Sequence, residues 1–155
     1  MHYWLMKSEP TEFSIDNLRS APKQTTWWTG VRNYQARNFM RDEMRVGDLA
    51  FFYHSSTAHP GIVGIVEVSH RAAPDQTQFD LSSDYYDPKA TPEKPRWFCV
   101  AVTLKEQFPL IALGDLRAQE KLAAMPLLKR GNRLSITPVT RAEWQLINTM
   151  RKKQV

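Results

Sequence analysis

The sequence predicts a small α+β domain, with a barrel-like sheet at its centre and short helices packed at the sheet's ends. The chain has 155 residues, a length that suits one compact domain with its own core. Several apolar segments have the two-residue period of strands, and only short segments have a helical period. Strands combined with few, short helices are typical of the α+β class.

The N-terminal segment is expected to form a strand followed by a short helix. Residues Tyr3 to Met6 are rich in aromatic side chains and alternate loosely, which favours a strand. A proline in the stretch SEPTEFS then ends it. Ser14 is a suitable N-cap for a helix in IDNLRSA, which Pro22 ends.

A second helix is expected over Asn33 to Met44, after a loop in the segment TTWWTG. Successive helical residues turn by about 100°, which puts three apolar side chains in one core-facing stripe: Ala36, Met40 and Met44. A polar stripe runs along its edge, made of Asn33, Arg37 and Arg41 and flanked by Tyr34. A polar stripe beside a buried face is where the lip of a cleft is expected.

The middle of the chain carries the strongest strand patterns. In LAFFYHS, residues 49–55, both alternating faces are apolar, so this strand should be covered on both sides. GIVGIVEVS and WFCVAVTLKEQF are predicted as two further strands. The segment from His70 to Arg96, with four prolines, is expected to be a long ordered loop.

The C-terminal third is predicted to contain short helices, a strand and a final helix. IALGDLRAQEKLAAM is expected to form one or two short helices, and GNRLSITPV a turn followed by a strand. Thr140 and Glu143 have the spacing of a capping box that opens the last helix. Trp144 and Ile147 should face inward. We take 1–155 as one domain with a basic C-terminal tail over 148–155.

Charge is distributed unevenly along the chain, whose net charge is +5. Residues 19–45 contain six basic and two acidic residues, and residues 126–155 contain seven basic and one acidic. In contrast, residues 67–94 contain six acids and three bases. If folding brings the basic ends together, they form a surface suited to a polyanion such as nucleic acid.

Composition also suggests where the protein works. The single cysteine, Cys99, excludes an internal disulfide framework, which fits a reducing compartment. No signal peptide or membrane-spanning run is apparent. We expect a soluble cytoplasmic protein (nuclear if eukaryotic), bacterial in type, without a membrane partner and with a monomer favoured.

Catalytic motifs are not apparent, so we expect a non-enzymatic protein without a cofactor. His54 and Ser55 are strand neighbours that point to opposite faces, so no triad with Asp48 follows. The four histidines lack metal-ligand spacing, and the chain has no phosphate-binding or dinucleotide fingerprint. A protein-interaction module that docks through the acidic loop 75–93, or less favourably a small hydrolase, remains an alternative.

An ordered series of motifs resembles the EVE domain family over nearly the whole chain: WLMKSEP, WTGVRNYQARNFM, GDLAFFYHS, GIVGIVEV, YYDP, PRWFCVAV and RLSITPV. The resemblance implies a PUA-like fold, a curved mixed β-barrel of about five to six strands with short flanking helices. It also implies kinship with YTH and ASCH domains, which hold a nucleobase, often a modified one, in a pocket.

We therefore expect the protein to bind one modified base of DNA or RNA. That base would belong to a single strand or be flipped out of a duplex. An aromatic pocket for that base would draw on Ser8, Trp28, Asn33, Tyr34, Phe52, Tyr53, His54 and Trp97. Phosphates would be bound by Lys7, Arg32, Arg37, Lys129, Arg130 and Arg133. Structural roles compete with several of these: Asn33 as a helix cap, Arg37 as an ion-pair partner of Asp42 or Glu43, and His54 as a hydrogen-bonded core residue.

Overall fold

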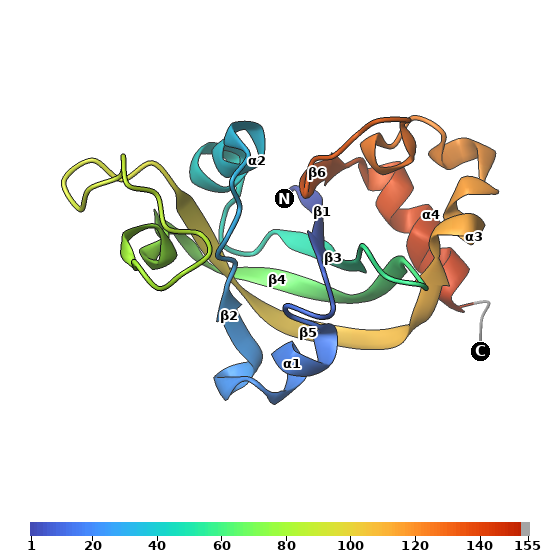
Figure 1. Ribbon diagram of the computed structural model, residues 1–155. Helices are drawn as coiled ribbons and strands as arrows, with labels where there is room; N and C mark the ends of the chain where they lie inside the picture. Colours follow the sequence, from blue (N-terminus) through green and yellow to red (C-terminus); the bar gives the residue numbers. More distant parts are fainter. Residues whose placement is uncertain (153–155) are drawn as a thin grey trace.

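The computed structural model describes residues 1–152, which form one curved six-stranded sheet with helices on both faces (Figure 1). The strands are β1 (Tyr3–Ser8), β2 (Thr25–Trp27), β3 (Leu49–His54), β4 (Gly61–Pro74), β5 (Phe98–Ala112) and β6 (Ile136–Val139). The helices are α1 (Ile15–Ser20), α2 (Tyr34–Asn38), α3 (Leu113–Arg117) and α4 (Arg141–Lys152). Single turns of helix are η1 (Pro22–Gln24), η2 (Phe39–Glu43), η3 (Gln76–Phe79), η4 (Glu120–Leu122) and η5 (Pro126–Leu128).

The sheet is mixed and open. Its strand order is β2-β5-β4-β3-β1-β6, with β1 parallel to β3 and the other pairs antiparallel. Within residues 1–152 the edge strands β2 and β6 do not pair, so the predicted barrel does not close. Several register shifts between β4 and β5 bend these two long strands, because bulges increase local twist.

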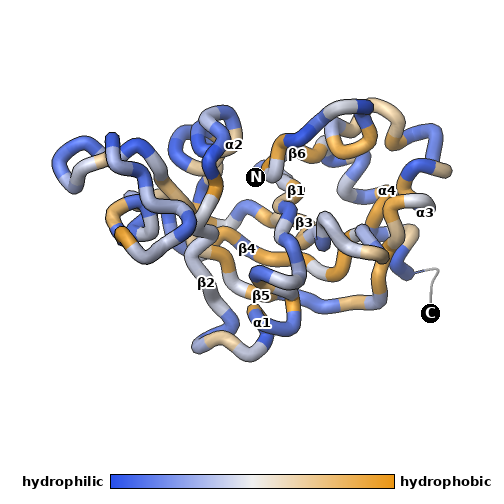
Figure 2. Tube along the Cα trace, viewed as in Figure 1, coloured by the Kyte–Doolittle hydropathy of each residue, from blue (hydrophilic) through white to orange (hydrophobic). Residues whose placement is uncertain are grey.

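Two hydrophobic cores lie on opposite faces of the sheet, as the doubly apolar strand β3 predicted. Ala50 and Phe52 point into the core that α1, α2 and Trp28 cover. Phe51 and Tyr53 point into the second core, which α3 and α4 cover. Figure 2 shows hydrophobic residues along the strands and polar residues along the outer segments. A strand between two cores can carry buried side chains at every position.

Helix caps follow the predicted local chemistry. The Ser14 side chain accepts from the Asn17 amide at the start of α1. Thr140 and Glu143 form the predicted reciprocal capping box of α4, with N···O distances of 2.9 and 3.1 Å. Trp144 and Ile147 are buried. Helix α4 runs to Lys152, so residues 148–152 of the expected tail are helical, and 153–155 lie outside the described residues.

Two predicted loops and one predicted helix differ from the structure. The expected loop in TTWWTG contains β2, which pairs with β5 through long-range contacts that no local pattern encodes. The expected helix over Asn33 to Met44 is divided into α2 and the π-turn η2, yet its predicted core-facing stripe is confirmed, because Ala36, Met40 and Met44 are all buried in one core. The expected loop from His70 begins later, because β4 extends to Pro74 and η3 follows.

Candidate functional site

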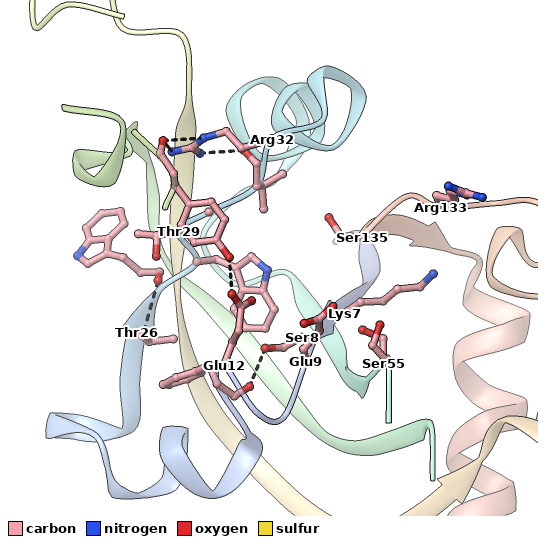
Figure 3. A pocket seen from close by; sticks show the side chains of 17 residues that line it. Lys7, Ser8, Glu9, Glu12, Thr26, Thr29, Arg32, Ser55, Arg133 and Ser135 are labelled. Carbon is pink, nitrogen blue, oxygen red and sulfur yellow. Dashed lines mark hydrogen bonds between the residues drawn. The ribbon is translucent and has the colours of Figure 1, made fainter. Parts of the chain in front are cut away.

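A cavity of about 760 Å³ opens between the end of β1, the segment that links β2 to α2, and the chain before β6 (Figure 3). Backbone hydrogen bonds hold these segments together: the Lys7 amide donates to the Ser135 carbonyl at 2.8 Å, and the Ser55 amide donates to the Ser8 carbonyl at 3.0 Å. The lining residues are Lys7, Ser8, Glu9, Glu12, Phe13, Thr26, Trp27, Trp28, Thr29, Gly30, Val31, Arg32, Ser55, Ser56, Tyr85, Arg133 and Ser135.

Trp28 supplies an aromatic wall of this cavity. Its amide donates to the Val100 carbonyl at 2.8 Å, which fixes the residue directly after β2. The indole meets the Phe52 ring edge-on, with centroids 5.3 Å apart. Trp28 is buried, with 7% of its surface exposed. Among residues 1–152 its ring N–H has no hydrogen-bond partner, and it is not one of the fully buried side-chain atoms that lack one. The N–H therefore keeps some access to the cavity and can donate to a ligand.

Tyr85 forms a second wall from the loop between η3 and β5. A Cβ added to Gly30 would lie 2.8 Å from the Tyr85 ring, and Gly30 has a φ of +86°. Only glycine combines this backbone conformation with such a close ring contact. The Tyr85 hydroxyl donates to Glu12 Oε1 at 2.7 Å, which joins the loop to the turn after β1.

Arg32 fastens the Tyr85 loop to the chain after β2. Its guanidinium donates to the Tyr85 carbonyl at 2.7 and 3.2 Å, to Thr77 Oγ1 at 3.0 Å and to the Val31 carbonyl at 3.0 Å. It also pairs with the buried carboxylate of Asp75 at 3.2 Å. Each of its five N–H directions therefore meets an acceptor, so the expected phosphate ligand is instead a structural clamp.

The cavity contains charges of both signs. Lys7 and Arg133 add positive charge, and Glu9 and Glu12 add negative charge. Burial lowers the pKa of Lys7 below its usual range, because desolvation disfavours the ammonium form. An anion at Lys7 would restore the interactions that the ammonium group loses in the free protein.

The predicted helix edge does not line the cavity. Asn33 caps α2 by accepting from the Ala36 amide at 3.0 Å. Tyr34 stacks on Trp97, with centroids 4.8 Å apart, and is half exposed. Arg37 donates to the Arg96 carbonyl at 2.8 Å and covers the Tyr34 ring. None of these three residues forms the predicted lip of this cavity, because the Asn33 side chain caps α2 and the Tyr34 and Arg37 side chains contact Trp97 and the Arg96 carbonyl before β5.

Other expected pocket residues are packed away from the cavity. Phe52 is fully buried behind Trp28, and Tyr53 lies in the core on the opposite face. The Nε2 of His54 accepts from the Ile15 amide at 3.1 Å, and burial lowers the pKa of His54. Trp97 is buried and donates to Asp87 at 2.8 Å. None of these four residues lines the cavity, and Phe52 supports its wall by packing against Trp28.

The remaining predicted site residues differ in whether they line the cavity. Ser8, Trp28, Lys7 and Arg133 line the cavity, whereas Lys129 and Arg130 lie in the turn before it and are absent from its lining. Residues outside the predicted set also line it, notably Glu9, Glu12, Gly30 and Tyr85. Glu9 lies in the motif WLMKSEP and Glu12 just after it, Gly30 lies in WTGVRNYQARNFM, and Tyr85 lies in YYDP. The family motifs could therefore have identified these lining residues.

A family model described as "EVE domain" matches residues 2–150. The chain belongs to the EVE domain family. It is 41% identical to human thymocyte nuclear protein 1 over 98% of this chain and 75% of that protein. It also resembles a crystal structure of a Pseudomonas putida protein, with 49% identity, a TM-score of 0.91, and coverage of 96% and 99% of the two chains.

A second solved structure is that of human THYN1, in complex with DNA that contains 5-methylcytosine. The identity is 39% and the TM-score 0.93, and the alignment covers 98% of each chain. At 9% identity and a TM-score of 0.54, an ASCH protein from Zymomonas mobilis shares the fold alone with this EVE domain.

Among residues 1–152 no group of three or more histidine, cysteine or acidic side chains is arranged to hold a metal ion. In the same range, no helix is both long and apolar enough to cross a membrane.

Proposed function

We propose that this EVE domain is a non-enzymatic reader that binds DNA and holds one modified base, extruded from its stack, in the cavity beside Trp28. The observation that carries the proposal is a hollow of about 760 Å³ with an indole wall, whose ring nitrogen is free to donate, and with cations from two separate segments. Ligand sites of this kind have volumes of roughly 300–1,000 Å³. The relative solved with 5-methylcytosine DNA supports the same ligand class.

The energetics suit a single base. Extruding a base costs a few kcal/mol, and stacking on an aromatic side chain returns roughly 1–3 kcal/mol. Trp28 supplies such a face because Phe52 holds its ring edge-on and the Val100 carbonyl holds its backbone. A preorganised ring loses little side-chain freedom when the base arrives.

Phosphate groups next to the base would contact Lys7 and Arg133, which lie at the cavity on the far side from Arg32 (Figure 3). Each neutralised phosphate makes binding depend on salt, with a slope of about −0.7 per contact on single strands. Arg32 and Arg37 would support this site indirectly, since their guanidinium groups already bind backbone carbonyls.

The alternative of a protein-docking loop over 75–93 is less favoured. Asp75 is buried against Arg32, and Asp87 accepts from the Trp97 indole, so two acids of this loop point inward. Their charge holds the fold together and adds little to a docking surface.

Binding to oligonucleotides that differ only in one modified base tests the proposal. Trp28→Ala should abolish the preference for the modified base, and Trp28→Phe should keep part of it because a ring remains. Arg133→Ala should weaken binding to modified and plain oligonucleotides equally and lower the salt slope by about one contact. The matched controls are Tyr86→Ala and Arg71→Ala, exposed residues outside the cavity lining.

Unfolding measurements on each variant separate loss of the site from loss of the fold. A folded Trp28→Ala protein with the wild-type preference would refute the cavity as the base site. A wild-type protein that binds no oligonucleotide would refute the proposed function itself.

A further inference from the structure

The cavity wall presents a carboxylate whose position is fixed from two sides. Glu12 lies in the turn after β1, and its amide donates to the Glu9 carbonyl at 2.9 Å. Its Oε1 accepts from the Tyr85 hydroxyl at 2.7 Å, as Figure 3 shows. Within residues 1–152, Oε2 of Glu12 has no hydrogen-bond partner. One carboxylate oxygen thus holds the side chain in place while the other is free to accept.

Tyr85 is itself held firmly, so it can position Glu12. Arg32 donates twice to the Tyr85 carbonyl, and the Tyr85 ring packs on Gly30. The hydrogen bond to Glu12 raises the pKa of Tyr85 to about 12, so the hydroxyl remains protonated and continues to donate. A carboxylate restrained in this way is preorganised for a second hydrogen bond toward the cavity.

A reader of methylated cytosine must solve a particular discrimination problem. Thymine has the same ring and the same 5-methyl group as 5-methylcytosine, and every DNA contains it. The two bases differ at position 4, where cytosine carries an amino donor and thymine a carbonyl acceptor. An aromatic wall and an apolar recess recognise the ring and the methyl group, so they cannot separate the two. A hydrogen-bond acceptor at the cavity wall can separate the two bases.

We propose that Glu12, positioned by Tyr85, makes the cavity selective for a base with an exocyclic amino group, such as cytosine and its 5-substituted forms, over thymine and uracil. This inference rests on the proposed function and adds the determinant of specificity. The free oxygen of Glu12 would accept from the amino group, as Glu and Asp accept from the cytosine N4 amino group. With thymine, two acceptors would face each other, and the buried edge would lose its partner.

Glu9 is the competing acceptor because it also lines the cavity. Both residues are exposed, and the difference between them is that no side-chain hydrogen bond holds Glu9 among the described residues. Ordering a free side chain on binding reduces its contribution, so the restrained Glu12 is the better placed of the two.

The test compares Kd values for two single-stranded oligonucleotides that are identical except for one 5-methylcytosine or one thymine. Single strands remove the different costs of breaking the two base pairs. The wild-type protein should bind the 5-methylcytosine strand roughly 5- to 150-fold more tightly, the range for one good base-edge contact. Glu12→Gln should bring that ratio close to one, because the amide can present either its oxygen or its amino group. Tyr85→Phe keeps the ring on Gly30, frees Glu12, and should reduce the ratio in part.

Glu93→Gln, an equal change of charge at an exposed residue outside the cavity lining, should leave the ratio unchanged. The measurement reports a ratio of two affinities, so a general loss of folded protein would not change it. Two outcomes would overturn the inference: equal wild-type affinity for both strands, or a wild-type ratio retained in Glu12→Gln. A collapse of the ratio in Glu9→Gln alongside the second outcome would assign the role to Glu9. Either outcome would still leave the proposed base cavity standing, whereas absent wild-type binding to any strand would remove both the inference and the proposed function.

Discussion

Replacing Gln78 should destabilise the loop that carries Tyr85, although Gln78 is outside the cavity lining. This side chain is fully buried and makes four hydrogen bonds to backbone groups. Its amino group donates to the Asp75 and Trp97 carbonyls, both at 2.8 Å. Its Oε1 accepts from the Arg96 and Trp97 amides, both at 2.9 Å. Gln78 thus connects η3 with the start of β5, at both ends of the loop.

The expected loss of stability depends on which backbone groups lose their only hydrogen-bond partner. The two carbonyls keep a second donor, since the Asp75 amide donates to the Trp97 carbonyl and the Gln78 amide to the Asp75 carbonyl. The Arg96 and Trp97 amides would have no acceptor. An orphaned buried amide costs about 1–3 kcal/mol, and the Trp97 amide is buried whereas the Arg96 amide is part-buried, so Gln78→Met should lower the free energy of unfolding by roughly 1–6 kcal/mol. Methionine has a similar volume, so a cavity contributes little.

Urea unfolding followed by tryptophan fluorescence measures this loss. In thermal unfolding, a stability loss of about 3 kcal/mol should lower the Tm by roughly 6–12 °C in a domain of this size. The matched control is Gln76→Met, an exposed position two residues earlier in the same η3 turn. If the two variants unfold within about 1 kcal/mol of each other, the Gln78 hydrogen bonds do not hold the loop and the reasoning is refuted.

Two further predictions concern the segments around the cavity. Gly30→Ala should lower the free energy of unfolding by at least about 1–2 kcal/mol, because alanine at a φ of +86° is strained and its Cβ meets the Tyr85 ring. In urea unfolding, the double variant Gly30→Ala with Tyr85→Ala should lose less than the sum of the single variants, and strict additivity would exclude the ring contact. Burial lowers the pKa of His54 in the folded protein, opposed by Asp16, so the unfolded chain binds more protons just below pH 6.5. Stability should therefore fall as the pH drops below 6.5. His54→Gln keeps an acceptor for the Ile15 amide and should flatten the plot of unfolding free energy against pH between pH 5 and 7. Equal slopes for the variant and the wild type would contradict this role of His54.

Predictions based on local chemistry agreed with the structure. The two apolar faces of Leu49–His54 indicated a strand covered on both sides, because alternation reports the faces of its own element. The Ser14 cap and the Thr140–Glu143 capping box depend on neighbours three residues apart, so the sequence contains both partners.

Predictions that depended on distant partners agreed less well. Trp28 and Trp97 look equivalent in the sequence and both are buried, yet Trp28 lines the cavity whereas Trp97 stacks against Tyr34 and donates to Asp87. Arg32 was expected to bind phosphate because no local signal revealed Asp75 and Tyr85 as its partners, 43 and 53 residues away. Ion pairs and stacking contacts of this kind are decided by tertiary packing.

The amino-acid sequence by itself determined every strand except β2, the helix caps and, through its ordered motifs, the EVE family, because each depends on residues close together in the chain. Only the tertiary structure decided where the cavity lies and which side chains face it. A cavity is the space left between segments that meet from the two halves of the chain, here the turn after β1, the link from β2 to α2, the Tyr85 loop and the chain before β6. Its lining therefore depends on how those segments pack, which no local period reports.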